Sequence, residues 1–429
     1  MLDQIIENII RNIRNEVVQP NMDQIPLAYI MTRNIPNSVK HFFDQEVELW
    51  LREEAEKFSS SDRFDYEMPE VRVLIDKIFD ILKQTATFHI TVFNRLLERA
   101  IKLEARYLIT PHRTLTQFLF KDSHVITTME VYDMLKYFDK FSYYKDALTD
   151  YFNLKYLREI SEPQFEELIR AIDDQVFSRS PVETTLQMVK TIVDFLNEGR
   201  EMPTNTVPLA ILKDAFEDRN LNDYSRIVET EMAAGTLEVS LEDLEKMLRS
   251  GKALVEMRAA AATTPSPVEA IADIEEQRPE IEVESIEVSE TVEIPAPEPE
   301  VEEEFEEELE EEEEEVVAPA GETSGAAEQL AQVVAEKIKG EKLEDLNAMI
   351  SKKQRKKFIK KVFRKDEGRY VEFIDLLNRT PDWKQASSLI DDYFFEAGIN
   401  PYSKEALEFS DVVYSRYFPK DRPLADDEF

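Results

Sequence analysis

Residues 301–320 of the chain read VEEEFEEELEEEEEEVVAPA, and this run is the centre of an acidic tract that divides the sequence in two. The tract, residues 265–328, holds 26 Asp and Glu residues against one basic residue, Arg278, so it carries a charge of −25 out of the chain's −38. Such a segment buries too little apolar surface to offset the entropy lost on ordering, and its charges repel one another. We therefore predict a disordered acidic linker over residues 259–328.

The sequence on either side of the linker predicts helix throughout. The chain has only eight glycines, and the first is Gly199, so the turns that hairpins and phosphate-binding loops use are missing from the first half. Apolar residues instead recur at three- and four-residue spacing. The expected fold class is all-α, with two independently folded bodies. These are a large N-terminal helical domain over residues 1–258, with an internal boundary near 197–207, and a small C-terminal helical module over residues 329–420, followed by an acidic tail over residues 421–429.

Local start and stop signals divide these two bodies into separate helices. Pro69 suits the first turn of a helix, where its missing N–H costs nothing. Residues 84–87 are the expected break in an apolar stripe that would otherwise run for some 40 residues. Ser240 and Ser351 are expected to cap the helices that follow them, and Gly398 to end another.

The first expected helix, residues 2–18, has one continuous apolar face. Three roles fit this face: docking on the chain's own core, self-association or binding of a partner, and lying on a membrane. The helix carries a net charge of −1 and so lacks the basic side that anionic lipid attracts. Docking on the core is therefore favoured, with self-association through residues 2–18 as the main alternative. The residues that form the face are Leu2, Ile5, Ile6, Ile9, Ile10, Ile13 and Val17.

The residues that usually carry chemistry are scarce. The chain has no cysteine, which leaves no disulfide, thiol nucleophile or cysteine-based metal site. Its four histidines form no zinc-protease or carboxylate-bridged di-iron spacing, and no GxSxG elbow occurs. The first residues lack the basic region and apolar core of a secretory signal, and no run of eighteen apolar residues occurs, so we expect neither a signal nor a membrane span. We expect no catalytic residue, no metal, no cofactor and no membrane span, and hence a non-enzymatic, cytoplasmic protein.

One basic segment stands out in the C-terminal module. Nine cations and no acid occur in fourteen residues, alongside apolar residues at helical spacing. The simplest interpretation is a core helix with a solvated lysine face. The functional alternative is a surface that binds an anionic partner, namely nucleic acid, acidic lipid or an acidic protein. As a third hypothesis, the glutamates of residues 302–315 mask this helix within the same chain. The nine candidate binding residues are Lys352, Lys353, Arg355, Lys356, Lys357, Lys360, Lys361, Arg364 and Lys365.

A second, weaker signal is the pair His112 and Arg113, which follows Pro111 in the first turn of an expected helix. Cations are disfavoured there by the helix dipole. The pair indicates a plain surface turn, a bound anion, or a buried carboxylate partner such as Glu104. The surface turn is the favoured interpretation.

These observations favour a non-enzymatic protein–protein interaction or scaffold protein, in which an acidic linker tethers two helical modules. Its protein partner is not identified by any motif. The alternative is a nucleic-acid-associated factor that binds through residues 352–365, with the acidic tract as an intramolecular competitor.

Overall fold

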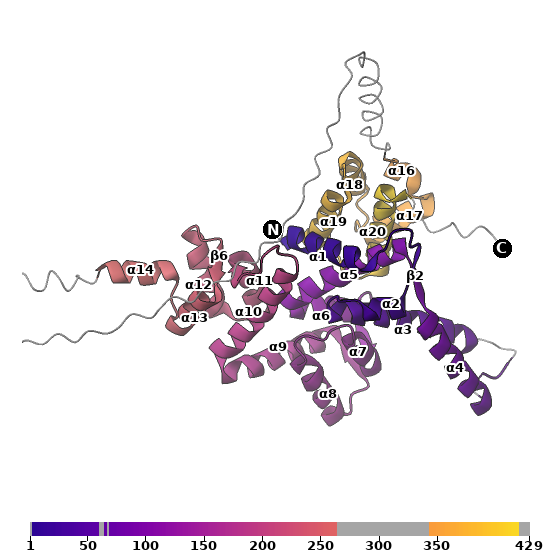
Figure 1. Cartoon of the computed structure of the whole chain (residues 1–429), viewed down its shortest axis with the longest axis horizontal. Helices are drawn as coiled ribbons and strands as arrows, with labels where there is room; N and C mark the ends of the chain where they lie inside the picture. Colours follow the sequence, from indigo (N-terminus) through magenta and orange to yellow (C-terminus); the bar gives the residue numbers. More distant parts are fainter. Residues whose placement is uncertain (1, 60–63, 67, 264–342, 420–429) are drawn as a thin grey trace, which may run out of the picture. The chain divides into compact units, whose positions relative to one another are not determined.

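The computed structural model describes residues 2–59, 64–66, 68–263 and 343–419 (Figure 1). Residues 264–328 of the predicted linker and the acidic tail, residues 421–429, lie outside these residues. The start of the linker was placed too early, because residues 259–263 belong to a helix, Leu254–Thr263. The described chain is helical apart from six very short strands, which confirms the all-α class and the small C-terminal helical module. The other domain boundaries remain predictions.

The helices before the acidic tract are α1 (Leu2–Val17), α2 (Leu27–Thr32), α3 (Asn37–Ser59), α4 (Pro69–Thr85), α5 (Ile90–Ile109), α6 (Pro111–Phe120), α7 (Thr128–Leu135), α8 (Tyr143–Lys155), α9 (Glu162–Arg179), α10 (Pro181–Glu198), α11 (Leu209–Asp218), α12 (Asn222–Ala233), α13 (Leu241–Ser250) and α14 (Leu254–Thr263). Those after it are α16 (Leu346–Met349), α17 (Lys352–Lys361), α18 (Glu367–Arg379), α19 (Trp383–Ala397) and α20 (Lys404–Tyr417). The strands are β1 (Gln24–Pro26), β2 (Thr87–His89), β3 (Val125–Thr127), β4 (Glu159–Ser161), β5 (Thr206–Pro208) and β6 (Glu238–Ser240).

The helix boundaries follow the predicted signals closely. Pro69 is the first residue of α4, and β2 begins just after α4 ends, at the expected break. The hydroxyls of Ser240 and Ser351 each accept a hydrogen bond from a backbone N–H three residues later, as helix caps do. Gly398 ends α19 with φ of 62°, a left-handed conformation that suits glycine.

The six strands form three antiparallel pairs, β1–β2, β3–β4 and β5–β6, which the sequence analysis did not foresee. The central residues of each pair face one another and are buried. The hydrogen bonds that flank the first pair run from Leu27 N–H to the Ala86 carbonyl and from Ile90 N–H to the Asp23 carbonyl, and equivalent bonds flank the other two pairs. The central pairs are Ile25–Phe88, Ile126–Ile160 and Val207–Val239.

Each strand lies between two helices, so the N-terminal part contains three copies of one arrangement, in which two helix–strand–helix units are joined through their strands. Helix–loop–helix units are also the building block of EF-hands, whose loops supply several carboxylates to Ca²⁺. Among the described residues, no group of three or more His, Cys, Asp or Glu side chains is placed to hold a metal ion. The repeated arrangement forms the framework of the N-terminal part.

Helix α1 packs on this framework with its apolar face inward. The side chains of Ile5, Ile9 and Val17 are buried in the main core. Gly199, which follows α10, makes the close packing possible, because a Cβ at that position would lie 2.4 Å from the carbonyl oxygen of Ile5. The apolar face of residues 2–18 is thus used within the chain, in line with the favoured prediction.

The apolar face of helix α4 is exposed, which the sequence analysis did not predict. Its apolar stripe continues that of α5 in the sequence, yet Leu74 and Ile81 are each 60% exposed and Ile78 is 46% exposed. The helix projects from the neighbouring helices (Figure 1) and is held to α3 by Lys83, which pairs with Asp44 at 3.0 Å. Helical periodicity identifies an apolar face but does not say whether a neighbour covers it.

The C-terminal helices α16–α20 have a core of their own, in which Phe358, Phe363, Tyr370 and Phe409 are buried. They nevertheless belong to the same compact unit as residues 1–261. We expected two bodies that do not pack on each other. In the structure, α19 and α20 instead pack against α5 through paired charges.

Among the described residues, no helix has the length and apolar composition needed to cross a bilayer.

Candidate functional site

The nine cations predicted as a binding surface lie on α17 and the turn after it. Three of them have partners. Lys357 pairs with Glu408, Arg355 pairs with Glu367 at 3.0 Å, and Arg364 donates a hydrogen bond to the Gly398 carbonyl at 3.2 Å. The other six are exposed and make no ion pair or side-chain hydrogen bond with the described residues; we call them the α17 basic surface. They are Lys352, Lys353, Lys356, Lys360, Lys361 and Lys365.

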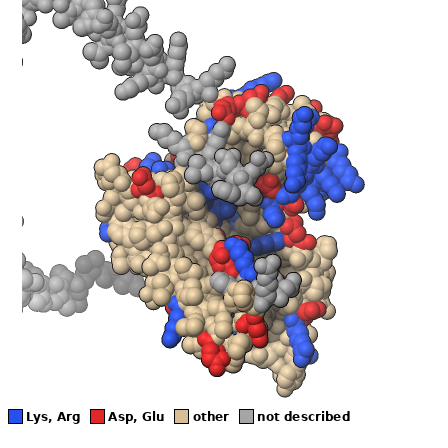
Figure 2. Space-filling model, turned by 90° about the vertical axis from the view of Figure 1, so that its right-hand side faces the viewer, with Lys and Arg blue, Asp and Glu red and all other residues tan. Residues whose placement is uncertain are grey.

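The α17 basic surface faces away from the core. Phe358 anchors α17 in the core of the C-terminal helices, and four of the six lysines lie on the opposite side of the helix by the 100° step of helical geometry. Figure 2 shows Lys and Arg side chains gathered together on the surface of the molecule. The predicted residues are thus brought together, and most of them remain available to a ligand.

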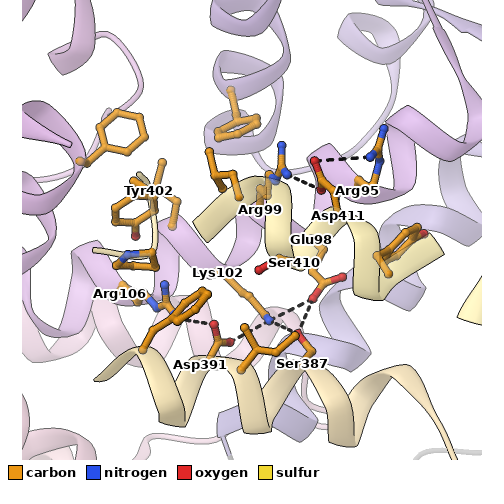
Figure 3. Close-up of a pocket in the computed structure, with 18 of the residues that line it drawn as sticks. Arg95, Glu98, Arg99, Lys102, Arg106, Ser387, Asp391, Tyr402, Ser410 and Asp411 are labelled. Carbon is orange, nitrogen blue, oxygen red and sulfur yellow. Dashed lines mark hydrogen bonds and ion pairs between the residues drawn. The ribbon is translucent and has the colours of Figure 1, made fainter. Parts of the chain in front are cut away.

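A second group of cations, missed by the sequence analysis, forms a row along α5. Arg95, Arg99, Lys102 and Arg106 follow one another at spacings of four, three and four residues, which places them on one face of the helix. This face points toward α19 and α20 (Figure 3).

Two aspartates of the C-terminal helices lie against this row, and each contacts two of its cations. Asp411 of α20 lies 2.5 Å from Arg99 and 3.5 Å from Arg95. Asp391 of α19 lies 2.9 Å from both Lys102 and Arg106. The four cations are therefore held in two sets by two carboxylates, and these contacts dock the C-terminal helices on α5.

The pKa shifts agree with this pairing. Burial disfavours the charge on Asp391, but Lys102 and Arg106 outweigh burial and lower the pKa of this carboxyl. Burial likewise opposes the charge on Lys102, and Glu98 and Asp391 together outweigh it and raise the lysine's pKa. Both groups are charged at neutral pH, as an ion pair requires.

Glu98 extends the network from α5 to the start of α19. Its carboxylate lies 3.0 Å from Lys102 and accepts hydrogen bonds from the Trp383 indole N–H at 2.8 Å and from the Ser387 hydroxyl at 3.0 Å. A further tie comes from the Asn400 amide, which donates to a carbonyl of α6 at 2.8 Å.

A cavity of about 300 Å³ lies beside this charge network, between α3, α5 and α6 on one side and α19 and α20 on the other. Its lining includes the four cations of the α5 row together with aromatic and aliphatic side chains. Pockets with apolar walls and a few polar groups, placed between packed structural parts, are where small ligands usually bind.

A buried polar cluster lies elsewhere, around His112. The imidazole Nε2 of His112 is 2.7 Å from Oδ2 of Asp173, and this oxygen also accepts a hydrogen bond from the Tyr144 hydroxyl at 2.7 Å. The Tyr143 hydroxyl donates to the other oxygen, Oδ1, at 3.1 Å. Asp173 is 1% exposed and His112 is 8% exposed. The favoured prediction of a plain surface turn at His112 was therefore wrong, and the carboxylate partner is Asp173.

Glu104, the partner named in the sequence analysis, instead lies under Ser38, whose hydroxyl donates to it at 2.5 Å. Burial raises the pKa of Glu104 to about 7. A carboxyl whose pKa is higher in the folded chain than in the unfolded chain stabilises the fold at pH values below its unfolded-state pKa, which is 4.5 here. This stabilisation is lost as the pH rises through about 7, the pKa in the folded chain.

We expect Glu104→Gln to be more stable than the wild type at pH 8, by roughly 2–3 kcal/mol, and to differ little at pH 5. Urea unfolding of both proteins at the two pH values measures this. An equal difference at pH 5 and pH 8 would show that the carboxyl is not the cause.

Comparison with known proteins covers the C-terminal helices alone. Residues 347–418 match a family model described as a domain of unknown function (DUF8457). No curated protein and no solved structure matches the chain. The matched segment holds the α17 basic surface, Asp391 and Asp411, so both the exposed cations and the docking aspartates lie within the family region.

Proposed function

We propose that this chain is a non-enzymatic, cytoplasmic interaction protein that binds an acidic protein segment through the α17 basic surface. The proposal is carried by the exposure of the six lysines and by their lack of ion-pair partners. They are exposed, crowded and unpaired among the described residues, in a chain whose net charge is −38. Acids are plentiful, yet the neighbouring carboxylates pair with Arg355 and Lys357 and leave these six to solvent.

The placement of the aromatic residues favours a protein partner over single-stranded nucleic acid. Proteins that bind single strands combine a basic groove with aromatic rings on which bases stack. Here Phe358 and Phe363 point into the core, where each packs edge-on against Phe409. The α17 basic surface therefore offers charge without a stacking platform.

Because the α17 basic surface binds acidic segments, the chain's own acidic tract competes for it. The tract ends shortly before α17 in the sequence, so its glutamates are tethered near the lysines at high effective concentration. An external acidic partner then has to displace an internal one, and added salt weakens both contacts.

A labelled peptide with the sequence of residues 302–315 tests the proposal in the full chain. We expect binding that weakens with salt and falls at least tenfold in the variant Lys356→Glu, Lys360→Glu, Lys361→Glu, since three reversals at about 0.5 kcal/mol each amount to that factor. A matched control reverses three exposed lysines elsewhere that make no ion pair with the described part of the chain, and it is expected to bind like the wild type. These are Lys145, Lys155 and Lys190.

Two further arms separate the alternatives. If the tract competes in cis, replacing its residues 302–315 by glutamine will tighten peptide binding. A 14-nucleotide single-stranded DNA provides the nucleic-acid comparison. If DNA binds more tightly than the peptide, or if the lysine reversals leave peptide binding unchanged, the proposed function is wrong.

A further inference from the structure

The cavity between α5 and the C-terminal helices has the composition of a small-molecule site. Its volume of about 300 Å³ lies at the lower end of the range for ligand pockets. Apolar side chains form both walls, and docking of the C-terminal helices creates the space between them. The main apolar residues are Phe42, Leu49 and Phe118 on one side and Ile390, Phe394 and Leu407 on the other.

The charged groups around the cavity leave an excess of positive charge. Five cations and four carboxylates line it, and three of those carboxylates hold the cations of the α5 row. The fourth, Glu46, accepts a hydrogen bond from the Tyr137 hydroxyl at 3.1 Å, and burial raises its pKa. The fifth cation, Lys121, makes no ion pair with the described residues.

Lys121 and Tyr402 both line the cavity and both pack against Phe118. The Lys121 ammonium is 5.8 Å from the centre of the Phe118 ring, and the Tyr402 ring packs edge-on against the same phenylalanine at 5.3 Å. The Tyr402 hydroxyl is buried beside the Arg106 guanidinium, which can only donate to it, so its own O–H has no acceptor among the described residues. Buried polar atoms almost always have a partner, so a donor left unpaired beside a cation, at the edge of a cavity, points to a bound anion.

We propose that this cavity binds a small organic acid, with its apolar body between the Phe118 and Phe394 walls and its carboxylate held by Lys121 and Tyr402. The ammonium supplies charge and the neutral phenol donates a hydrogen bond. An uncharged molecule of the same shape would leave the Lys121 ammonium and the Tyr402 hydroxyl without a charged partner, so the site favours the anion.

The chain provides its own local reporter for this site. Its two tryptophans are Trp50 and Trp383, and Trp383 lines the cavity. In the variant Trp50→Phe, indole emission comes from Trp383 alone. Octanoate, octan-1-ol and octylamine are titrated into the full chain, with Trp383 emission and the heat of binding recorded in parallel.

We expect saturable binding of octanoate, at least tenfold weaker binding of octan-1-ol, and weaker binding still of octylamine. Lys121→Gln is expected to lower octanoate affinity about tenfold, the worth of one charged hydrogen bond, and to leave octan-1-ol unaffected. Tyr402→Phe keeps the ring against Phe118 and tests the hydroxyl separately, with an expected loss of severalfold. Lys145→Gln is the matched control, because Lys145 is exposed and remote from the cavity lining.

Octanoate and octan-1-ol binding equally well would overturn the proposal, and so would the absence of both heat and emission change up to the solubility limit. Unchanged octanoate affinity in both Lys121→Gln and Tyr402→Phe, with thermal melting that shows each variant folded, would also overturn it. None of the residues in this test belongs to the α17 basic surface, so its outcome is independent of the proposed function.

Discussion

Replacing Asp391 by lysine is expected to release the C-terminal helices from α5. The substitution removes the carboxylate that lies 2.9 Å from both Lys102 and Arg106, and it places a third cation beside them. Breaking a buried ion pair by removing one partner costs about 3–5 kcal/mol. Because these side chains keep 24–33% of their surface exposed, we expect a loss near the bottom of that range, about 3 kcal/mol.

The measurement follows two signals during urea unfolding in the Trp50→Phe background. Trp383 reports on the contact with Glu98, whereas far-UV circular dichroism reports mainly on the more numerous N-terminal helices. In the parent the two signals are expected to change together, and in Asp391→Lys the Trp383 transition is expected to move to lower urea. The control is Asp392→Lys, the exposed neighbour on α19, which makes no ion pair or side-chain hydrogen bond with the described residues of α5 and is expected to behave like the parent. Coincident transitions in both variants would contradict the docking account.

Replacing Arg219 by methionine is expected to destabilise the N-terminal part strongly. Arg219 is 1% exposed, and its guanidinium donates hydrogen bonds to the carbonyls of Leu108 at 3.0 Å, Ile109 at 2.9 Å and Ala215 at 3.1 Å. Two of these carbonyls belong to the last turn of α5, where no intrahelical partner exists. Methionine fills similar space but leaves the three acceptors unsatisfied.

Each buried polar group left without a partner costs about 1–3 kcal/mol, so we expect the free energy of unfolding to fall by about 3–5 kcal/mol. Arg226→Met on α12 is the matched control, because the Arg226 side chain is 77% exposed and pairs with the exposed Asp223 at 3.6 Å. That control is expected to change stability by less than about 0.5 kcal/mol. Equal stability of the two variants by urea unfolding would show that the carbonyls find other partners.

Features that depend on neighbours in the sequence could be predicted. The start of α4 at Pro69, the cap of α17 at Ser351 and the end of α19 at Gly398 each rest on the chemistry of one residue and its next few neighbours. The cluster of lysines on α17 could be predicted for the same reason, since nine cations in one helix need no tertiary information to be recognised.

The strand pairs could not be predicted, because each strand has only three residues. Three residues are too few for an alternating pattern, and a single turn with one glycine, Gly235 before β6, does not identify a strand. One signal does recur. The fifth residue after each strand centre is apolar and fully buried. A spacing of five fits neither the helical period of 3.6 residues nor the strand period of 2, so a search for those periods does not find it. These residues are Ile30, Phe93, Val131, Phe165, Leu212 and Leu244.

The docking network was missed because its halves are far apart in the chain. Lys102 and Asp391 are separated by 289 residues, and neither is unusual in a sequence with 52 basic and 90 acidic residues. The row Arg95, Arg99, Lys102 and Arg106 was the available signal, since four cations on one face beside a buried stripe indicate a second, polar contact.

The central claim is that the C-terminal helices are docked on α5 by two aspartates, each of which holds two cations. The absence of cysteine allows two spin labels to be placed on the full chain without background, one at Lys190 on α10 and one at Glu396 on α19, both exposed. Pulsed electron spin resonance then gives the distribution of distances between them. The account predicts a single narrow distribution that becomes broad in the double variant Asp391→Lys, Asp411→Lys; a broad distribution in the chain with both aspartates intact would contradict it.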